Sequence, residues 1–462
     1  MQRQELRAAV SLAAVFSVRM LGLFMIYPVF AAFARELAGA TPYKIGLALG
    51  IYGLSQGLLQ VPFGLLSDRI GRKTMIVFGL VLFGLGSAVA ASSRSIDGMI
   101  WGRVLQGAGA VGSVILALVA DLTAEENRTQ AMALVGMTIG FSFLVAIVAG
   151  PVVASWIGIG GIFWLMAALA LMGIAITTLL VPTPRRLRVH REAETVPALL
   201  GSTLRNPELL RLDFGIFALH AMLTASFLVV PELLHGTLGV STRDQWLVYF
   251  PVLMVSVAIM VPAIIVAERF RRMKTVLLGA ISALAASQLM LAMGGHDAVI
   301  LIAAVTLFFA GFNIMEASLP SLVTKTAPSG STGTATGIYS SSQFLGIFVG
   351  GVAGGWINQA AGTFAVFTFI SALAVLWLIV AGTMRPPNHL TTRVVRVAHC
   401  SAAEAARLSA RLREVPGVAE ALVIPEEGFA YLKVDAKTFD RAQAEAVVGV
   451  TVEPGRSQQC SF

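Results

Sequence analysis

A series of long apolar stretches, each almost free of charged residues, dominates this chain and limits what it can fold into. A helix rises about 1.5 Å per residue, so roughly 20 apolar residues cross the roughly 30 Å hydrocarbon core of a bilayer. Hydrophobic residues make up 56% of the chain and charged residues 13%, whereas about 25% are charged in an average soluble domain. The sequence therefore predicts an all-α membrane protein with twelve transmembrane helices.

The apolar stretches fall into two sets of six, which a polar segment rich in Arg and Pro separates. The first set is expected at residues 11–33, 45–66, 74–91, 99–120, 131–154 and 161–181, and the second at residues 212–234, 245–266, 275–293, 298–323, 337–357 and 363–383. The expected domains are an N-terminal six-helix bundle (1–181), a cytoplasmic linker (182–210), a C-terminal six-helix bundle (211–384), a second linker (385–392) and a cytoplasmic tail domain (393–462).

The tail has the composition of a soluble domain. Its pattern reads as a strand "RVVRV", a helix closed by Pro and Gly, two strands in "EALVIPEEGFAYLKVD", a second helix and a last strand "VTVE". This order predicts a small α+β domain of the βαββαβ, ferredoxin-like type. Cys400 and Cys460 are the two cysteines of the chain, and His399 precedes the first of them. We expect neither a disulfide nor a metal site there, because the tail faces a reducing compartment and a C-x-x-C pair is missing.

The orientation follows from the Lys and Arg residues of the short loops, which are retained on the cytoplasmic side. One side carries Arg69, Arg72, Lys73, Arg128, Arg185, Arg186, Arg188, Arg191, Arg269, Arg271, Arg272 and Lys274, and the other carries Arg35, Lys44, Arg94 and Arg243. Both termini are therefore expected to be cytoplasmic, in a multi-pass protein of the cell inner membrane. The net charge of +8 follows from this topology, so no nucleic acid is expected as a partner.

A short repeat relates the two sets of spans. "VPFGLLSDRIGRK" begins at Val61 and "VPAIIVAERFRRMK" begins at Val261, each after the second span of its set. Asp68 corresponds to Glu268 in this alignment. Repeated halves are typical of transporters that bind their substrate between two bundles.

Several motifs resemble those of one family. The loop after the second span matches the signature G-x-L-x-D-R-x-G-R-K of the major facilitator superfamily with Gly64, Asp68, Arg69, Gly71, Arg72 and Lys73. Arg103 and Gln106 resemble its fourth-helix motif, and Gly150 and Pro151 resemble the fifth-helix motif of its drug:proton antiporters. "FSVRMLGLFMIYPVF" and the tail domain are most similar to the YajR-type branch. The resemblance implies the major facilitator fold.

The signature loop also has a physical interpretation. Asp68 lies near the end of the second span, and Asp121, at the end of the fourth, is a candidate partner for Arg72 or Arg69. Such a cluster is expected to hold one conformational state closed, because ion pairs gain strength where packed helices exclude water. The alternative is a topology signal alone, which explains the bases but not Asp68 or the glycines.

Ionisable residues inside the spans are functional candidates, because a charge is costly there. Glu316 is the expected proton carrier, and the alternative is a permanently paired or neutral glutamic acid that fixes packing. His220 either shares that proton, binds substrate or is a packed hydrogen-bonding residue. Arg19 and Arg103 act as fixed charges, and Arg103 either tunes an acid or supports the bundle. A central cavity is expected near Arg19, His220, Asn313 and Glu316.

We therefore expect a proton-coupled secondary transporter, not an enzyme, that exports small organic or drug-like molecules by antiport through alternating access. A proton-coupled uptake symporter and a transporter-like sensor regulated through its tail are the alternatives. No phosphate-binding loop with its Lys is present, so ATP is not expected to drive transport. The expected partners are protons, a small-molecule substrate and the lipid bilayer, for a monomer without cofactor or metal.

Overall fold

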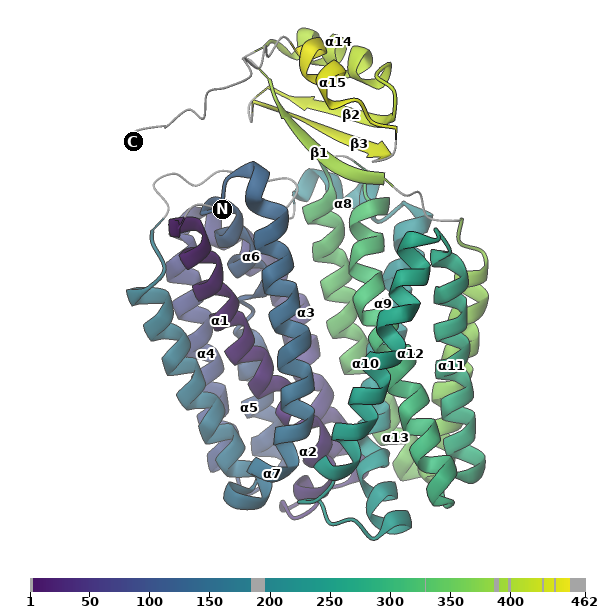
Figure 1. Cartoon of the computed structure of the whole chain (residues 1–462). Coiled ribbons are helices and arrows are strands. Elements are labelled where there is room, and N and C mark those ends of the chain that lie inside the picture. The colour runs from purple at the N-terminus through teal and green to yellow at the C-terminus, as the bar shows by residue number, and fades with distance from the viewer. Residues whose placement is uncertain are drawn as a thin grey trace.

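The computed structural model describes residues 3–183, 196–328, 330–385, 390–397, 400–425, 428–435 and 438–448. The expected last strand, Arg185, Arg186, Arg188, Arg191, His399 and Cys460 lie outside these residues. Two helical halves stand side by side, and the tail domain lies against one end of them (Figure 1). α1 begins at that same end, and α15, the last described helix, belongs to the tail domain (Figure 1).

The first half contains the helices α1 (Arg3–Met25), α2 (Tyr27–Ala34), α3 (Pro42–Ile70), α4 (Arg72–Ser92), α5 (Ile96–Ala108), α6 (Gly112–Asp121) and α7 (Glu125–Leu179). The second half contains α8 (Pro197–Thr203), α9 (Pro207–Leu238), α10 (Trp246–Arg269), α11 (Met273–Gly294), α12 (Ala298–Thr326) and α13 (Thr332–Gly382). Ten helical segments of the described chain are long and apolar enough to cross a membrane, and α5 and α6 together form one of them.

Two of these helices are double-length elements. α7 has 55 residues and α13 has 51, which at about 1.5 Å per residue is more than twice the thickness of a bilayer core. Each is interrupted by a glycine with positive φ, Gly158 at 67° and Gly362 at 77°. A residue with a Cβ would be strained in this conformation. Counting each as two spans gives twelve among the described residues, which confirms the predicted fold class.

Two of the predicted spans are not continuous helices. The span expected at residues 99–120 is broken at residues 109–111, where Gly109 packs so closely that a Cβ on it would lie 2.3 Å from the carbonyl oxygen of Gly79. The span expected at residues 11–33 is broken at Ile26, shortly before Pro28, which has no N–H to continue the helical ladder. Apolar length alone predicted neither break.

The two halves meet along α3 and α13 through facing glycines. A Cβ on Gly46 would lie 2.1 Å from the carbonyl oxygen of Gly351, and a Cβ on Gly53 would lie 2.4 Å from that of Phe344. Small residues allow such close approach of helix backbones inside a membrane. At the end far from the tail domain, the Arg35–Glu232 ion pair and the bond from the Tyr43 N–H to the Gln359 side chain also join the halves.

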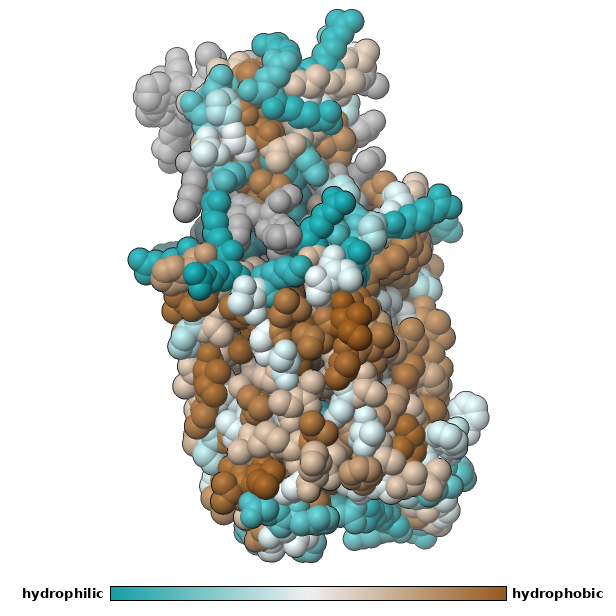
Figure 2. All heavy atoms as spheres, turned by 90° about the vertical axis from the view of Figure 1, so that its right-hand side faces the viewer, coloured by the Kyte–Doolittle hydropathy of each residue, from teal (hydrophilic) through white to brown (hydrophobic). Residues whose placement is uncertain are grey.

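The outer surface of the bundle is apolar. Figure 2 shows a hydrophobic band between two hydrophilic borders, one of them just below the tail domain. Large apolar side chains are exposed on it, including Trp101, Phe141, Trp164, Leu171 and Ile379. In water such a surface would drive aggregation, whereas lipid tails cover it.

The tail domain contains β1 (Leu390–Arg396), α14 (Ala402–Arg413), β2 (Val418–Ile424), β3 (Phe429–Asp435) and α15 (Arg441–Val448). The strands form an antiparallel sheet in the order β1-β3-β2. Both helices lie on its outer face, and the other face is turned toward the bundle (Figure 1). Leu432 and Val434 of β3 belong to the core on the helix side, while Tyr431 and Lys433 point the other way and are buried as well. The bundle therefore covers the second face of β3.

Candidate functional site

Arg72 forms the centre of a buried cluster at the tail end of the first half. Its side chain is 2% exposed and joins two carboxylates, Asp68 and Asp121, the second by a 3.1 Å bond from Nε to Oδ2. Its Nη1 also donates to the hydroxyl of Ser67 at 2.7 Å. Arg72 thus connects the end of α3, the start of α4 and the end of α6, as the sequence led us to expect for Arg72 and Asp121.

Glycines shape this cluster. Gly71 ends α3 and precedes α4 with φ 96°, so the chain reverses there without strain and Arg72 begins the next helix directly beneath Asp68. Gly64 faces Ser113, and together with Asp68 and Arg72 it lines a cavity that Gly333 of α13 closes from the second half. The cluster therefore borders the interface between the halves.

The other two bases of the signature loop are placed differently. The Lys73 ammonium donates to the carbonyl oxygens of Val181 at 2.8 Å and Thr178 at 3.4 Å, so it caps the end of α7. Cations are favoured there because the last carbonyls of a helix are unpaired. The side chain of Arg69 is exposed.

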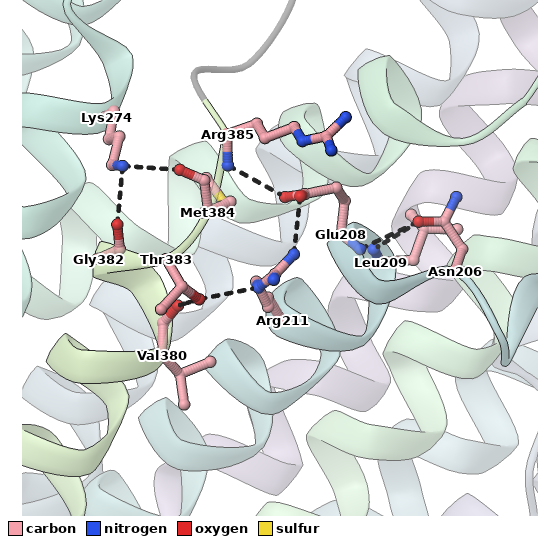
Figure 3. Close-up of polar contacts among 10 residues, drawn as sticks. All are labelled: Asn206, Glu208, Leu209, Arg211, Lys274, Val380, Gly382, Thr383, Met384 and Arg385. Carbon is pink, nitrogen blue, oxygen red and sulfur yellow. Dashed lines mark hydrogen bonds and ion pairs between the residues drawn. The ribbon is translucent and has the colours of Figure 1, made fainter.

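The second half repeats this arrangement with other partners. Lys274 donates to the carbonyl oxygens of Gly382 at 2.8 Å and Met384 at 2.7 Å, capping α13 as Lys73 caps α7 (Figure 3). Arg271 has φ 55° where the first half has Gly71. Glu268 pairs with Lys325 at the end of α12, at 2.7 Å.

Arg103 lies in a site without a carboxylate contact among the described residues. Nε donates to the carbonyl oxygen of Ala48 at 3.2 Å, Nη1 to the Gln106 side chain at 2.9 Å, and the guanidinium stacks 4.7 Å from the ring centroid of Tyr52. The Gln106 amide in turn donates to Ser87 at 2.7 Å. Of the two roles considered for Arg103, these contacts favour support of the helix bundle.

Arg19 contacts polar groups of α3. It donates to the hydroxyl of Tyr52 at 2.7 Å and to the side-chain oxygen of Gln56, and its Nε and Nη1 are buried without a hydrogen bond among the described residues. A buried cation with open donors is costly, so it is a position where an anionic or polar group gains from binding. Its contacts are to the first half, whereas the other expected cavity residues are on the second.

His220 and Glu316 face each other across α9 and α12. Their Nε2 and Oε2 atoms are 3.8 Å apart, and the Gln343 amide of α13 is 2.8 Å from the same Nε2. The His220 Nδ1 lies 3.3 Å from the carbonyl oxygen of Ile216, one turn back. A neutral imidazole that donates from Nδ1 and accepts at Nε2 satisfies both contacts.

The carboxyl group of Glu316 has an open hydrogen-bonding site. Its Oε2 is buried and has no hydrogen-bond partner among the described residues, and the same is true of the Asn313 amide nitrogen one turn earlier. Phe312, beside them, stacks on Phe143 of α7 at 5.4 Å between ring centroids and lies 5.8 Å from the ring of His220. The pair is thus next to the contact between the two halves.

The fifth-helix motif has a packing function. A Cβ on Gly150 would lie 2.4 Å from the carbonyl oxygen of Met25 and 3.1 Å from the ring of Pro28. α7 therefore contacts the first span at the point where that span is broken. Pro151 follows inside α7 and removes one helical hydrogen bond there.

Sequence reasoning missed four partners. Gln343 follows three serines in a span that is otherwise mostly apolar, and this polar run is a local signal for it. Lys325, Lys433 and Gln359 are ordinary helix-end or strand residues, and their roles depend on which elements lie beside them. For the cluster of Asp68, Arg72 and Asp121, the loop signature and the positions at the ends of spans pointed to the contact.

Known proteins match this chain along most of its length. The model of the Major Facilitator Superfamily matches residues 12–351 and 265–416, and the model of the YajR YAM domain matches residues 398–449. The inner membrane transport protein YajR of Escherichia coli (strain K12) is 43% identical over 96% of this chain and 97% of that protein. Multidrug resistance protein 2 of Bacillus subtilis (strain 168) is 32% identical over 36% of this chain and 41% of that protein.

A solved structure agrees at the level of the fold. The human organic anion transporter MFSD10 (TETRAN) has a TM-score of 0.59 and 19% identity, over 82% of this chain and all of that one. Twelve spans in two related halves, the signature loop and these matches agree with one another. The chain belongs to the major facilitator superfamily, in the YajR-type group that carries a C-terminal YAM domain.

Proposed function

We propose that this chain is a proton-coupled secondary transporter of the cell inner membrane that exports small organic or drug-like molecules by alternating access, as a monomer with cytoplasmic termini. Its relatives include an inner membrane transport protein and, over about a third of the chain, a multidrug resistance protein. Repeated helical halves around a central site are the general architecture for alternating access.

The observation that carries the proposal is the pairing of His220 with Glu316 next to the contact between the halves. A carboxylate in a water-poor site either finds a partner or takes up a proton. Glu316 is charged or neutral according to whether a proton is bound, and the open Oε2 leaves room for that exchange. His220 lies beside it as a neutral acceptor that can share the proton.

Coupling follows if protonation and substrate compete for this site. When the proposed central cavity near Glu316 is open to the outside, Glu316 takes up a proton and the substrate leaves. With the cavity open to the cytoplasm, the proton leaves and the next substrate binds. Arg19 and Asn313 are the further groups with which the cavity would bind polar parts of a substrate, because both keep unsatisfied buried donors.

The Arg72 cluster would act as the gate on the tail side. A buried arginine between two carboxylates stabilises the state in which α3, α4 and α6 are packed together. Opening this end separates the groups that line the cavity between α3 and α13, so the cluster would set the population of the two states.

Substitution of Glu316 tests the coupling directly. Glu316→Gln keeps the shape and the hydrogen bonding of the side chain but cannot change its charge. We expect this variant, in proteoliposomes, to bind substrate and to exchange it between the two sides, yet not to respond to an imposed pH difference. Glu36→Gln, an exposed position, is the matched control. Full proton-driven transport by Glu316→Gln would place coupling elsewhere, and His220→Asn would be the next variant.

The direction of transport needs a separate measurement. In the same vesicles an antiporter expels substrate against an inward flow of protons, whereas an uptake symporter accumulates substrate along with them. Accumulation on the side that receives the protons would favour the symporter.

A second candidate, a sensor that reports through its tail, has one observation in its favour. Lys433 of β3 is buried against the end of α12 and donates to the carbonyl oxygens of Thr324 and Lys325. Transport that proceeds at the same rate with and without the tail domain would remove this candidate.

A further inference from the structure

A wide cavity opens on the tail side of the second half, where α9 begins and α13 ends. Its volume is about 690 Å³, within the range of sites that bind small molecules. Three arginines, Arg205, Arg211 and Arg385, line it together with a single acid, Glu208. It lies apart from the pair of His220 and Glu316 and from the Arg72 cluster, and neither the proposed coupling nor the proposed gate uses it.

The three arginines differ in their contacts, and Figure 3 shows two of them, Arg211 and Arg385. Arg211 neutralises Glu208 through a 2.7 Å contact from Nη1 to Oε1, and its Nε donates to the Thr383 hydroxyl at 3.0 Å. Glu208 also accepts the backbone N–H of Arg385 at 3.4 Å. The guanidinium groups of Arg205 and Arg385 have no hydrogen bond or ion pair with another described residue, so the cavity keeps two uncompensated positive charges.

The position of the cavity relates it to the membrane surface. Arg385 follows the end of α13 closely, and Ile379, less than two turns earlier, is 63% exposed on the outer surface of that helix. Leu204 and Leu210, which flank the start of α9, are exposed too. The cavity therefore lies where the apolar surface ends and the polar end of the bundle begins, a boundary of the kind that Figure 2 shows on one face.

We propose that this cavity binds the phosphate group of an anionic phospholipid. Arg205 and Arg385 donate to the phosphate oxygens, because a guanidinium presents paired N–H groups that match them. The pair of Arg211 and Glu208 fixes the wall between α9 and α13. The exposed leucines and Ile379 contact the acyl chains, which a free phosphate does not have. Basic pockets on the cytoplasmic side of membrane helices bind lipid headgroups by this chemistry.

Lipid titration of the full-length protein tests the proposal. Phosphatidylglycerol is titrated into purified protein in neutral detergent, with phosphatidylcholine as the uncharged comparison, and bound lipid is counted by native mass spectrometry. One basic residue near an anionic lipid contributes about fivefold in affinity, so Arg205→Gln with Arg385→Gln should weaken phosphatidylglycerol binding by about 25-fold. Arg94→Gln with Arg243→Gln, two exposed arginines at the opposite end, should change it less than twofold.

Three outcomes would overturn the proposal. Equal phosphatidylglycerol affinity of the Arg205 and Arg385 variant and the wild type would show that the cavity is not the site. Equal wild-type affinity for phosphatidylcholine would remove the anionic requirement. Displacement of the lipid by a few millimolar inorganic phosphate would assign the site to a soluble anion. A further experiment needs only the wild type. The ratio of its affinities for phosphatidylglycerol and phosphatidylcholine should fall at least tenfold between 50 and 500 mM NaCl, because salt screens the charges.

Discussion

The two repeated loops of this transporter share a backbone plan but differ in what surrounds them. In the connection between α3 and α4, Arg72 is buried between Asp68 and Asp121. In the connection between α10 and α11, Glu268 is 43% exposed and binds Lys325, and Arg271 reaches Asp435 of the tail domain at 3.1 Å. The ion pairs of the first loop are formed within its own half, whereas the second loop also forms an ion pair with the separate tail domain.

This difference has an energetic meaning. Removing one partner from a buried charge pair leaves an uncompensated charge, which costs about 3–5 kcal/mol, whereas exposed pairs contribute about 0–1 kcal/mol. The first loop is therefore suited to hold a state firmly. The second loop is suited to regulation. Its exposed ion pairs are weak, so a small free-energy change in the tail domain is enough to form or break them.

The largest effect is expected for Arg72→Gln. The variant removes the buried cation that joins the carboxylates of Asp68 and Asp121, so we expect the free energy of unfolding to fall by about 3–5 kcal/mol. Arg272→Gln, in the exposed second loop, should change it by less than about 0.5 kcal/mol. Urea unfolding of both variants in detergent measures the difference, and equal losses would show that the two loops are energetically alike.

Asp68→Asn is expected to affect transport more than folding. Asp68 is partly exposed and Arg72 keeps Asp121, so most of the stability should remain, whereas the gate loses one of its two carboxylates. We expect transport to fall at least tenfold, with a thermal midpoint within a few degrees of the wild type. Glu268→Gln is the matched change in the second half and should reduce transport less than threefold. Normal transport by Asp68→Asn would contradict the gate.

Removal of the tail domain is expected to have an intermediate effect. Deletion of residues 386–462 exposes the end of α12 and frees Arg271, so the bundle should fold and insert while its transport rate changes by about two- to fivefold. Lys433→Met, which removes the cap on α12 but keeps the domain, should give part of the same change. Failure of the shortened chain to insert would mean that the domain is structural.

The smallest effect concerns the pH dependence of the tail domain. The backbone N–H and hydroxyl of Ser401 donate to the carboxylate of Glu404 at the start of α14 and lower its pKa from the usual value. Because the folded-state pKa lies below the unfolded one, this carboxylate stabilises the domain above its unfolded pKa. The contribution is lost as the pH falls through the folded-state value.

Amide hydrogen exchange of α14 in the full-length protein measures that loss. Protection should weaken in the wild type over the acid range that begins at about pH 4.3, the ordinary pKa of a glutamate side chain. In Glu404→Gln it should be weaker at neutral pH and depend less on pH in this window. The same acid response in both proteins would show that other carboxylates control the start of α14.

The sequence predicted what depends on local pattern. Apolar length gave the twelve spans. The loop signature with Asp68 and Arg72, together with the place of Asp121 at the end of the fourth span, gave a cluster whose members do meet. The helix break at Ile26 has a local signal in Pro28, which a prediction from apolar length alone does not take into account. The break at Gly109 was missed because it depends on a neighbour that approaches from elsewhere in the chain. Gln343 beside His220 and Lys433 on α12 were missed for the same reason. Gln343 and His220 are 123 positions apart in the chain. Lys433 is 109 and 108 positions from the two residues of α12 whose carbonyl oxygens it binds.

The attachment of the tail domain to the second half means that the domain moves together with that half. The contacts from Arg271 to Asp435 and from Lys433 to the end of α12 both join it to the second half. If the halves rock about their shared glycine contacts, the domain swings with one of them, and its far side travels further than any helix end. A spectroscopic label on α14 and a second on the first half would then report the transport cycle as a change in distance that the domain itself amplifies.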